Sequence, residues 1–114
     1  MKTIIAGGRN ITNYDCVVEA VSNAPWLITE VVSGMAKGVD SLGEQWAKRS
    51  VVPVKQFPAD WDTHGKKAGI LRNVDMGNYA EALIAIWDGK SRGTKHMIDY
   101  ATSKGLEVYV HYVK

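Results

Sequence analysis

The sequence is poor in the residues and runs that define several classes of protein. Cys16 is the only cysteine, so an intrachain disulfide framework and a zinc site built from several cysteines are both excluded. Apolar stretches reach only about five to seven residues, far short of the ~20 that span a bilayer. No signal-peptide-like apolar run follows Met1. We therefore expect a domain that is located in the cytoplasm and has no membrane partner.

An excess of one charge sign is also missing. The chain has 14 Lys and Arg residues against 12 Asp and Glu residues, a formal net charge of +2. This balance by itself predicts neither nucleic-acid nor membrane binding. The contents of 46% hydrophobic and 23% charged residues are those of a globular protein and exclude bulk disorder. A length of 114 residues predicts one domain, residues 1–114.

Short apolar runs alternate with helical patterns along the whole chain. Helical periodicity is clearest after Gly38, where Val39, Leu42, Trp46 and Ala47 share one helix face. The expected strands cover residues 3–6, 27–33, 52–57, 82–87 and 106–113. The expected helices cover 15–22, a segment that starts at Gly38 and includes Ala47, about 70–79, and 94–104.

Strict strand–helix alternation with short connections predicts parallel strands joined by right-handed crossovers. The fold class is therefore α/β, a doubly wound parallel five-stranded sheet with helices on both faces. Pro53 predicts an edge position for the third strand, and the alternating polarity of residues 106–113 suits the other edge. The simplest strand order is 3-2-1-4-5.

Ligands of such sheets bind outside the carboxyl ends of the strands, at the point where the winding reverses. Four glycine-containing segments leave the strands at that edge, at residues 7–10, 33–40, 57–69 and 88–95. Helices that start near Gly38 and Gly93 would direct unpaired N–H groups toward an anion. Charged contacts to phosphate would come from Arg9, Lys37, Arg72, Arg92 and Lys95, and hydroxyl donors from Ser33, Ser91 and Thr94.

Single glycine turns are common without any ligand, and no G-x-G-x-x-G or Walker A sequence is present. The prediction depends on the convergence of glycine and basic residues after the first, second and fourth strands. Of the basic residues, eight lie in or beside the four segments, with four aspartates, a local excess of about four. This pattern favours a small phosphate-bearing molecule over a long polyanion.

The segment after the third strand shows no obvious helix or strand over about a dozen residues, which is long for a compact domain. Its Trp61 could stack on a base or ribose, or it could cap the edge of the core. The aspartates of these segments could surround Mg²⁺, but they lack ligand spacing, so solvated or capping carboxylates are favoured: Asp40, Asp60, Asp62 and Asp88. We expect no bound metal and no required cofactor.

Four ordered motifs resemble the SLOG superfamily, in particular its small YspA/YpsA-like branch. The motifs are Ser-Gly-Met-Ala-Lys-Gly-Val-Asp at 33–40, Phe-Pro-Ala-Asp-Trp at 57–61, Gly-Lys-Lys-Ala-Gly-Ile-Leu-Arg-Asn at 65–73 and Ser-Arg-Gly-Thr-Lys at 91–95. The resemblance runs from Gly7 to about Ala101 and implies a Rossmann-like fold with a site for nucleotides or for NAD- and ADP-ribose-like ligands. It carries over as pocket residues Gly7, Gly8, Arg9, Ser33, Gly34, Asp40, Arg72, Gly93 and Thr94.

Together, the segments and the resemblance define the candidate ligand-binding residues. They are Gly7, Gly8, Arg9, Asn10, Ser33, Gly34, Lys37, Gly38, Asp40, Asp60, Trp61, Lys66, Arg72, Asn73, Asp88, Ser91, Arg92, Gly93 and Thr94. The leading hypothesis is a binding domain for a nucleotide-derived ligand, which acts as a sensor, carrier or sequestering protein. A homo-oligomer is plausible because relatives of this kind often self-associate.

The resemblance also implies two alternatives. The LOG phosphoribohydrolases share the Arg-x-x-x-Met segment, here Arg72 to Met76, and would make the protein an N-glycosidic nucleotide hydrolase with Arg72 in the active site. Met97 stands where that family has a catalytic Glu, and Asp88 or Asp99 would have to replace it. The DNA-processing protein DprA resembles residues 33–40 and would imply single-stranded DNA binding, but no extended basic face is evident, so nucleic acid is disfavoured.

Overall fold

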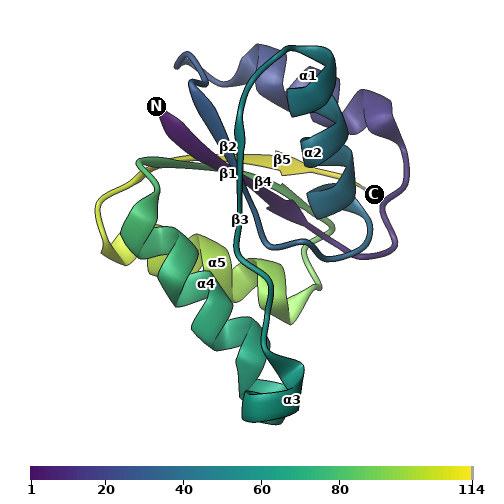
Figure 1. The fold of residues 1–114 in the computed structure, drawn as a ribbon. Coiled ribbons are helices and arrows are strands. Elements are labelled where there is room, and N and C mark those ends of the chain that lie inside the picture. Colours follow the sequence, from purple (N-terminus) through teal and green to yellow (C-terminus); the bar gives the residue numbers. More distant parts are fainter. Residues whose placement is uncertain (114) are drawn as a thin grey trace.

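The structure is a computed structural model that describes residues 1–113, and it contains one five-stranded sheet (Figure 1). All strand pairs are parallel, and the strand order is β3-β2-β1-β4-β5. The strands are β1 (Lys2–Gly7), β2 (Glu30–Ser33), β3 (Val54–Gln56), β4 (Ala82–Trp87) and β5 (Glu107–Tyr112). The predicted fold class and strand order are confirmed.

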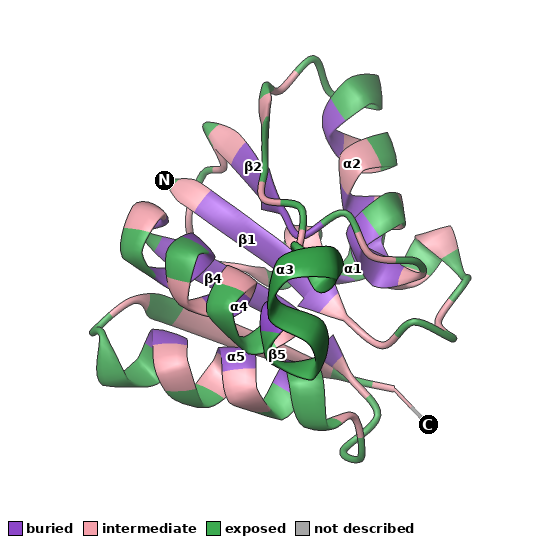
Figure 2. Cartoon of the chain, turned by 60° about the horizontal axis from the view of Figure 1, so that its bottom comes forward, coloured by how far each residue is buried: buried purple, intermediate pink, exposed green. Residues whose placement is uncertain are grey.

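Helices cover both faces of the sheet (Figure 1). The helices α1 (Tyr14–Asn23) and α2 (Val39–Arg49) pack on one face, and α4 (Ala68–Tyr79) and α5 (Arg92–Ser103) pack on the other. Because side chains alternate along a strand, Ile5 faces the first pair of helices while Ile4 faces the second. The central strands β1 and β4 are therefore apolar on both sides, and Figure 2 shows them buried.

Local contacts and backbone conformations explain where several helices begin and where α5 ends. The Asn13 side chain accepts a hydrogen bond from the backbone N–H of Asp15 (3.0 Å) and so caps α1. At α2, Gly38 has φ +75°, and Val39 and Ala47 of the predicted helix face are fully buried. Gly105 follows α5 with φ +78°, the left-handed conformation typical of the residue after a helix.

Several predicted boundaries differ from the observed ones. The second strand begins at Glu30, not at residue 27, because Leu27 is 82% exposed and precedes the paired segment. The third strand is shorter than predicted and pairs only through Val54–Gln56. The helix expected from residue 94 begins at Arg92, because the side chain of Ser91 caps it.

The prediction that residues 57–69 lack regular structure is wrong. The segment contains the short helix α3 (Trp61–His64) and the 3-10 turn η1 (Gly65–Lys67), and α4 begins at Ala68 instead of residue 70. The carboxylate of Asp60 accepts a hydrogen bond from the N–H of Thr63 (3.1 Å), which caps α3. These residues are exposed in Figure 2 and project from the sheet in Figure 1, so hydrophobic periodicity could not reveal them.

Among the described residues, no helix has the length and apolar character required to cross a membrane.

Candidate functional site

The main cleft lies at the carboxyl ends of β1 and β4, where the winding of the chain reverses. Its volume is about 570 Å³, within the range of small-molecule sites. It is lined by Ala6, Gly7, Gly8, Arg9, Asn10, Ile11, Ala36, Asp40, Trp61, Lys66, Gly69, Ile70, Arg72, Asn73, Met76, Asp88, Lys90, Ser91, Gly93, Thr94 and Met97.

The N-terminus of α5 opens into this cleft. Ser91 caps the helix: its Oγ accepts a hydrogen bond from the N–H of Thr94 (3.4 Å) and lies 3.0 Å from the Thr94 hydroxyl. The N–H groups of Arg92 and Gly93 occupy the first turn, where no helical partner exists. Together with the helix dipole, these groups favour an anion beside Gly93.

The loop before α5 is held in place by its own polar groups. Oδ1 of Asp88 accepts hydrogen bonds from the N–H groups of Lys90 (2.8 Å) and Ser91 (2.9 Å). These bonds favour the carboxylate form and lower the pKa of Asp88. Trp87 donates from Nε1 to the carbonyl oxygen of Ser91 (3.1 Å), so this tryptophan anchors the loop from its partly buried position.

The N-terminus of α2, in contrast, is covered by the loop after β1. A Cβ on Gly38 would lie 2.3 Å from the carbonyl oxygen of Gly8 and 2.6 Å from that of Arg9. Val39 also donates its N–H to the Gly8 carbonyl (3.3 Å). Gly38 does not line the cleft, and the predicted opening of α2 toward a ligand is not found. The glycine is needed for the close approach of two backbones.

Three residues from distant segments meet at the carboxyl end of β2. Arg72 of α4 donates from Nη1 to the carbonyl oxygen of Gly34 (2.5 Å). A Cβ on Gly34 would lie 2.6 Å from that Nη1 and 2.8 Å from Oδ2 of Asp40. The absence of a side chain at Gly34 therefore lets the guanidinium and the carboxylate pack against the backbone and line the cleft.

Further hydrogen bonds orient Arg72 from its own helix. Its Nε donates to Oδ1 of the next residue, Asn73 (3.1 Å). The Asn73 amide in turn donates to the carbonyl oxygen of Gly93 (3.3 Å) and lies 3.2 Å from Nδ1 of His96. The chain of contacts joins α4 to the first turn of α5, so the arginine and the helix N-terminus are positioned by one network.

Asp40 is the buried carboxyl group of the site. It is 5% exposed, and its Oδ2 accepts a hydrogen bond from the N–H of Ala36 (3.3 Å). Burial raises the pKa of Asp40 to about 6, against the opposing effect of the Arg72 charge. Burial also lowers the pKa of Arg72, and the nearby charge of Arg9 acts in the same direction. The cleft thus contains two neighbouring guanidinium groups and one carboxyl group that titrates near pH 6.

A side cleft of about 400 Å³ adjoins the main cleft and shares four of its lining residues. The guanidinium of Arg9 lies 5.7 Å from the ring centroid of Trp61, and the indole is 48% exposed. The side cleft is lined by Arg9, Gly34, Met35, Ala36, Lys37, Pro58, Ala59, Trp61 and Arg72.

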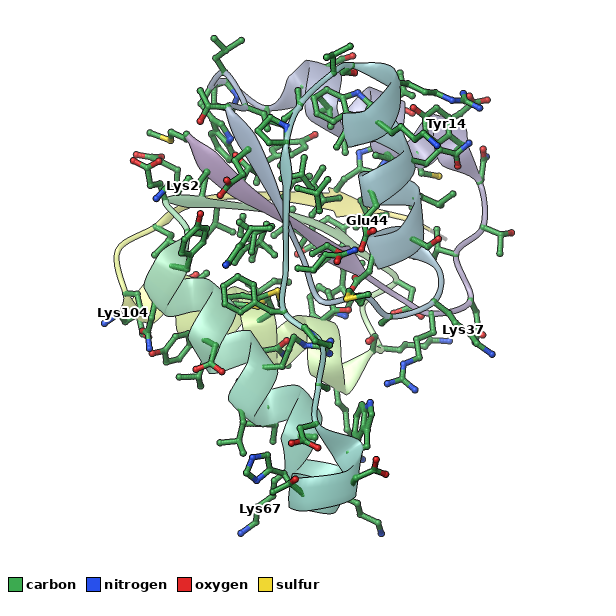
Figure 3. The ribbon with its side chains drawn as sticks, in the orientation of Figure 1. Lys2, Tyr14, Lys37, Glu44, Lys67 and Lys104 are labelled. Carbon is green, nitrogen blue, oxygen red and sulfur yellow. The ribbon has the colours of Figure 1, made fainter. Side chains whose placement is uncertain are left out.

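The structure brings most of the sequence-predicted residues to these two clefts. The main cleft includes Gly7, Gly8, Arg9, Asn10, Asp40, Trp61, Lys66, Arg72, Asn73, Asp88, Ser91, Gly93 and Thr94, and the side cleft adds Gly34 and Lys37. Figure 3 shows Lys37 on the loop after β2, and Lys67 at the far tip of the α3–η1 projection. The lining of the two clefts together includes five basic residues, Arg9, Lys37, Lys66, Arg72 and Lys90, and two acidic residues, Asp40 and Asp88.

Four predicted residues lie outside both clefts. The buried hydroxyl of Ser33 donates to Oε2 of Glu44 (2.5 Å), which points from α2 toward the sheet (Figure 3). Asp60 caps α3, Gly38 packs against the loop after β1, and Arg92 is exposed at the start of α5. None of the four therefore contributes a side chain to either cleft.

Sequence reasoning also missed several lining residues. Seven of them are apolar residues or glycine, which the sequence does not distinguish from core or ordinary loop residues: Ala6 in β1, Ile11 and Ala36 in loops, Gly69, Ile70 and Met76 in α4, and Met97 in α5. Lys90 is basic and lies in the segment after β4, a signal that could have identified it. Within residues 1–113, no group of three or more His, Cys, Asp and Glu side chains is arranged to hold a metal ion.

Comparison with known proteins identifies the class of protein that this fold and cleft represent. Residues 1–64, more than half of the chain, match the YspA, cpYpsA-related SLOG family (YAcAr), so the chain belongs to that family. It is also similar to the Gene 61 protein of Mycobacterium phage D29. The two are 32% identical over an alignment of 117 positions, which covers 94% of this chain and 93% of the relative. No solved structure gives a significant match.

Proposed function

We propose that the main cleft binds a nucleotide or nucleotide-derived small molecule of the NAD or ADP-ribose type, and that the protein acts as a sensor, carrier or sequestering protein for it. The observation that carries the proposal is the convergence on one cleft of the open α5 N-terminus and the Arg72 guanidinium. Family membership supports the same ligand class.

Charge and shape support a phosphate-bearing ligand. Phosphate oxygens would accept hydrogen bonds from the first N–H groups of α5 and from Arg9 and Arg72. The half-exposed ring of Trp61 lies at the cleft wall and would stack on a base. Asp88 and Asn73 add polar groups suited to ribose hydroxyls.

Thermal shift and titration calorimetry with AMP, ADP, ADP-ribose and NAD⁺ test the proposal. We expect at least one of these to raise the melting temperature of the wild-type chain at millimolar concentration. Arg72→Ala should lower the affinity for that ligand tenfold or more, because a charged hydrogen bond contributes about 1.5–3 kcal/mol.

Arg92→Ala is the matched control, since the Arg92 side chain is exposed and lines neither cleft, and the variant keeps the backbone N–H at the start of α5. Its affinity should equal that of the wild type. If none of the four compounds binds, or if Arg92→Ala weakens binding as much as Arg72→Ala, the proposed site is wrong. Preferential binding of single-stranded DNA with a steep salt dependence would favour the DNA alternative instead.

A second candidate function, N-glycosidic hydrolysis, is favoured by one observation: Asp40 is a buried carboxyl group that lines the cleft beside Arg72. Met97 lines the same cleft but cannot stabilise positive charge at a ribose carbon, and Asp99 is paired with Lys95 on the outer surface of α5 (2.7 Å). In this reaction, water adds to the ribose carbon while the C–N bond breaks. The electron pair of that bond leaves with the base: adenine takes up a proton, whereas nicotinamide leaves NAD⁺ as a neutral base and the proton of the water goes to solvent. A carboxylate stabilises the charge that develops on the ribose.

Incubation with AMP and NAD⁺, followed by chromatography for free adenine and nicotinamide, separates the two candidates. Release of base that Asp40→Asn abolishes would establish hydrolysis. Binding without release over many hours would leave the ligand-binding proposal as the function.

A further inference from the structure

The main and side clefts form one bipartite site with two guanidinium groups at the boundary. Arg9, Ala36, Trp61 and Arg72 line both clefts, so the two spaces adjoin at these four residues. The volumes are about 570 Å³ and 400 Å³, each sufficient for a small-molecule group.

The two spaces differ in chemistry. The main cleft contains the first turn of α5, Asp88 and Asn73, which suit a polar group with hydroxyls and phosphate. Away from the boundary, the side cleft is lined by Met35, Pro58 and Ala59 together with Gly34 and the exposed Lys37. Its apolar walls suit the face of an aromatic ring.

The boundary itself favours an anion. The Arg72 guanidinium is held by the Gly34 carbonyl, and the Arg9 guanidinium lies against the Trp61 ring. Their like charges repel, and the pKa of Arg72 is lowered partly by Arg9. Asp40, the acidic group that acts on Arg72, is raised in pKa by its burial and so offsets this repulsion only in part near pH 6. A phosphate group between the arginines would satisfy both.

We propose that the natural ligand consists of two ring-bearing halves joined by a diphosphate, with the nucleoside half in the main cleft, the diphosphate beside Arg9 and Arg72, and the second ring in the side cleft. This inference rests on the proposed function and narrows it, because a mononucleotide leaves the side cleft empty. The class it selects is the dinucleotide type, represented by NAD⁺.

Calorimetry on the wild-type chain provides the first test. NAD⁺ should bind at least tenfold more tightly than ADP, which has the diphosphate but lacks the second ring, and ADP should bind more tightly than AMP. Equal affinities for NAD⁺ and ADP would overturn the inference and leave the proposed function standing. No binding of any of the three would reject the proposed function itself.

Substitutions that fill the side cleft provide the second test. Ala59→Trp should lower the NAD⁺ affinity tenfold or more, to the level of ADP, and leave the ADP affinity unchanged. Leu27→Trp is the control, because Leu27 is exposed and lines neither cleft, and both affinities should stay at wild-type values. Equal losses of NAD⁺ and ADP affinity in Ala59→Trp would contradict the assignment of the second ring. If this variant does not fold by circular dichroism, Ala59→Leu and the wild-type ligand series decide the question.

Discussion

The Nη1 of Arg72 donates a hydrogen bond to the carbonyl oxygen of Gly34, 38 residues earlier in the chain, at 2.5 Å. The bond joins α4, on one face of the sheet, to the loop that follows β2. It brings the guanidinium to the boundary of the two clefts, because Gly34 has no side chain that would displace it. The position of the arginine therefore depends on a glycine that is remote from it in sequence.

Gly34→Ala should separate ligand binding from stability. The added Cβ would lie 2.6 Å from Nη1 of Arg72, the flexible end of a side chain, so the guanidinium moves and its bond to residue 34 is lost. We expect the affinity for AMP or NAD⁺ to fall at least tenfold, while the free energy of unfolding falls by only about 1–2 kcal/mol. Calorimetry and urea denaturation measure the two effects. Unchanged affinity would show that the position of Arg72 is irrelevant to binding.

Gly7→Ala should reduce stability more than Gly34→Ala does. Its Cβ would lie 2.3 Å from the carbonyl oxygen of Ile86 and 2.7 Å from Cγ2 of Val39, so β1, β4 and α2 would have to separate. The expected loss in the free energy of unfolding is roughly 3 kcal/mol. Gly93→Ala is the stability control: apart from its chain neighbours and the backbone of its own helix, no atom lies within 4 Å of the added Cβ. Alanine also favours a helix over glycine, so stability should be equal or slightly higher. Similar denaturation midpoints for the two variants would refute this packing argument.

Asp40 should make the protein less stable as the pH rises from about 4 to 6. Its pKa is about 6 in the folded state against 3.8 as the ordinary value, so the folded state retains a proton that the unfolded chain has lost. Stability from the protonated group is complete below pH 3.8 and is lost as the pH passes about 6. At about 1.4 kcal/mol per pH unit, Asp40→Asn should gain about 3 kcal/mol relative to the wild type between pH 4 and 7.

Urea denaturation at a series of pH values measures this difference. Asp60→Asn is the control of opposite sign, because hydrogen bonds from Thr63 lower the pKa of Asp60. Its carboxylate stabilises the fold at neutral pH, and that contribution is lost as the pH falls, so Asp60→Asn should be less stable than the wild type at pH 7. A difference between Asp40→Asn and the wild type that does not change with pH would mean that Asp40 is not desolvated.

Trp61 should contribute to affinity through its ring face. Stacking of a base on an aromatic side chain is worth about 1–3 kcal/mol, so Trp61→Leu should bind AMP or NAD⁺ roughly tenfold more weakly, while Trp61→Phe retains most of the affinity. Bound ligand should also reduce acrylamide quenching of the 48% exposed indole. If the Leu and Phe variants bind equally well, Trp61 only covers the edge of the core.

Much of the candidate site could be predicted because parallel strands place their carboxyl ends together. Once Gly8, Ser91 and Arg72 are assigned to loops and helix starts on that edge, their approach follows from the strand order. The short helix α3 could not be predicted, because its stability comes from an Asp60 cap and its residues are all exposed. The position of Ser33 outside both clefts could not be predicted either, because the sequence does not show that its hydroxyl faces Glu44.

The two helix N-termini show the same limit. Gly38 and Gly93 both lie at the start of a helix after a glycine-containing loop. From the sequence, both helix N-termini are therefore predicted to face a ligand. In the folded protein, the backbone of Gly8 and Arg9 covers the first, while the second opens into the main cleft. Which helix dipole is free for a ligand depends on how two loops pack against each other.

The sequence by itself therefore determined the α/β class, the strand order and the edge at which polar and glycine residues gather, because periodicity and connection length are local properties. Only the tertiary structure decided which of those residues face the clefts, that Asp40 is buried with a pKa of about 6, and that a second space adjoins the first at Arg9 and Arg72. Desolvation and the closeness of like charges depend on atoms that are far apart in the chain, and only folding brings those atoms together.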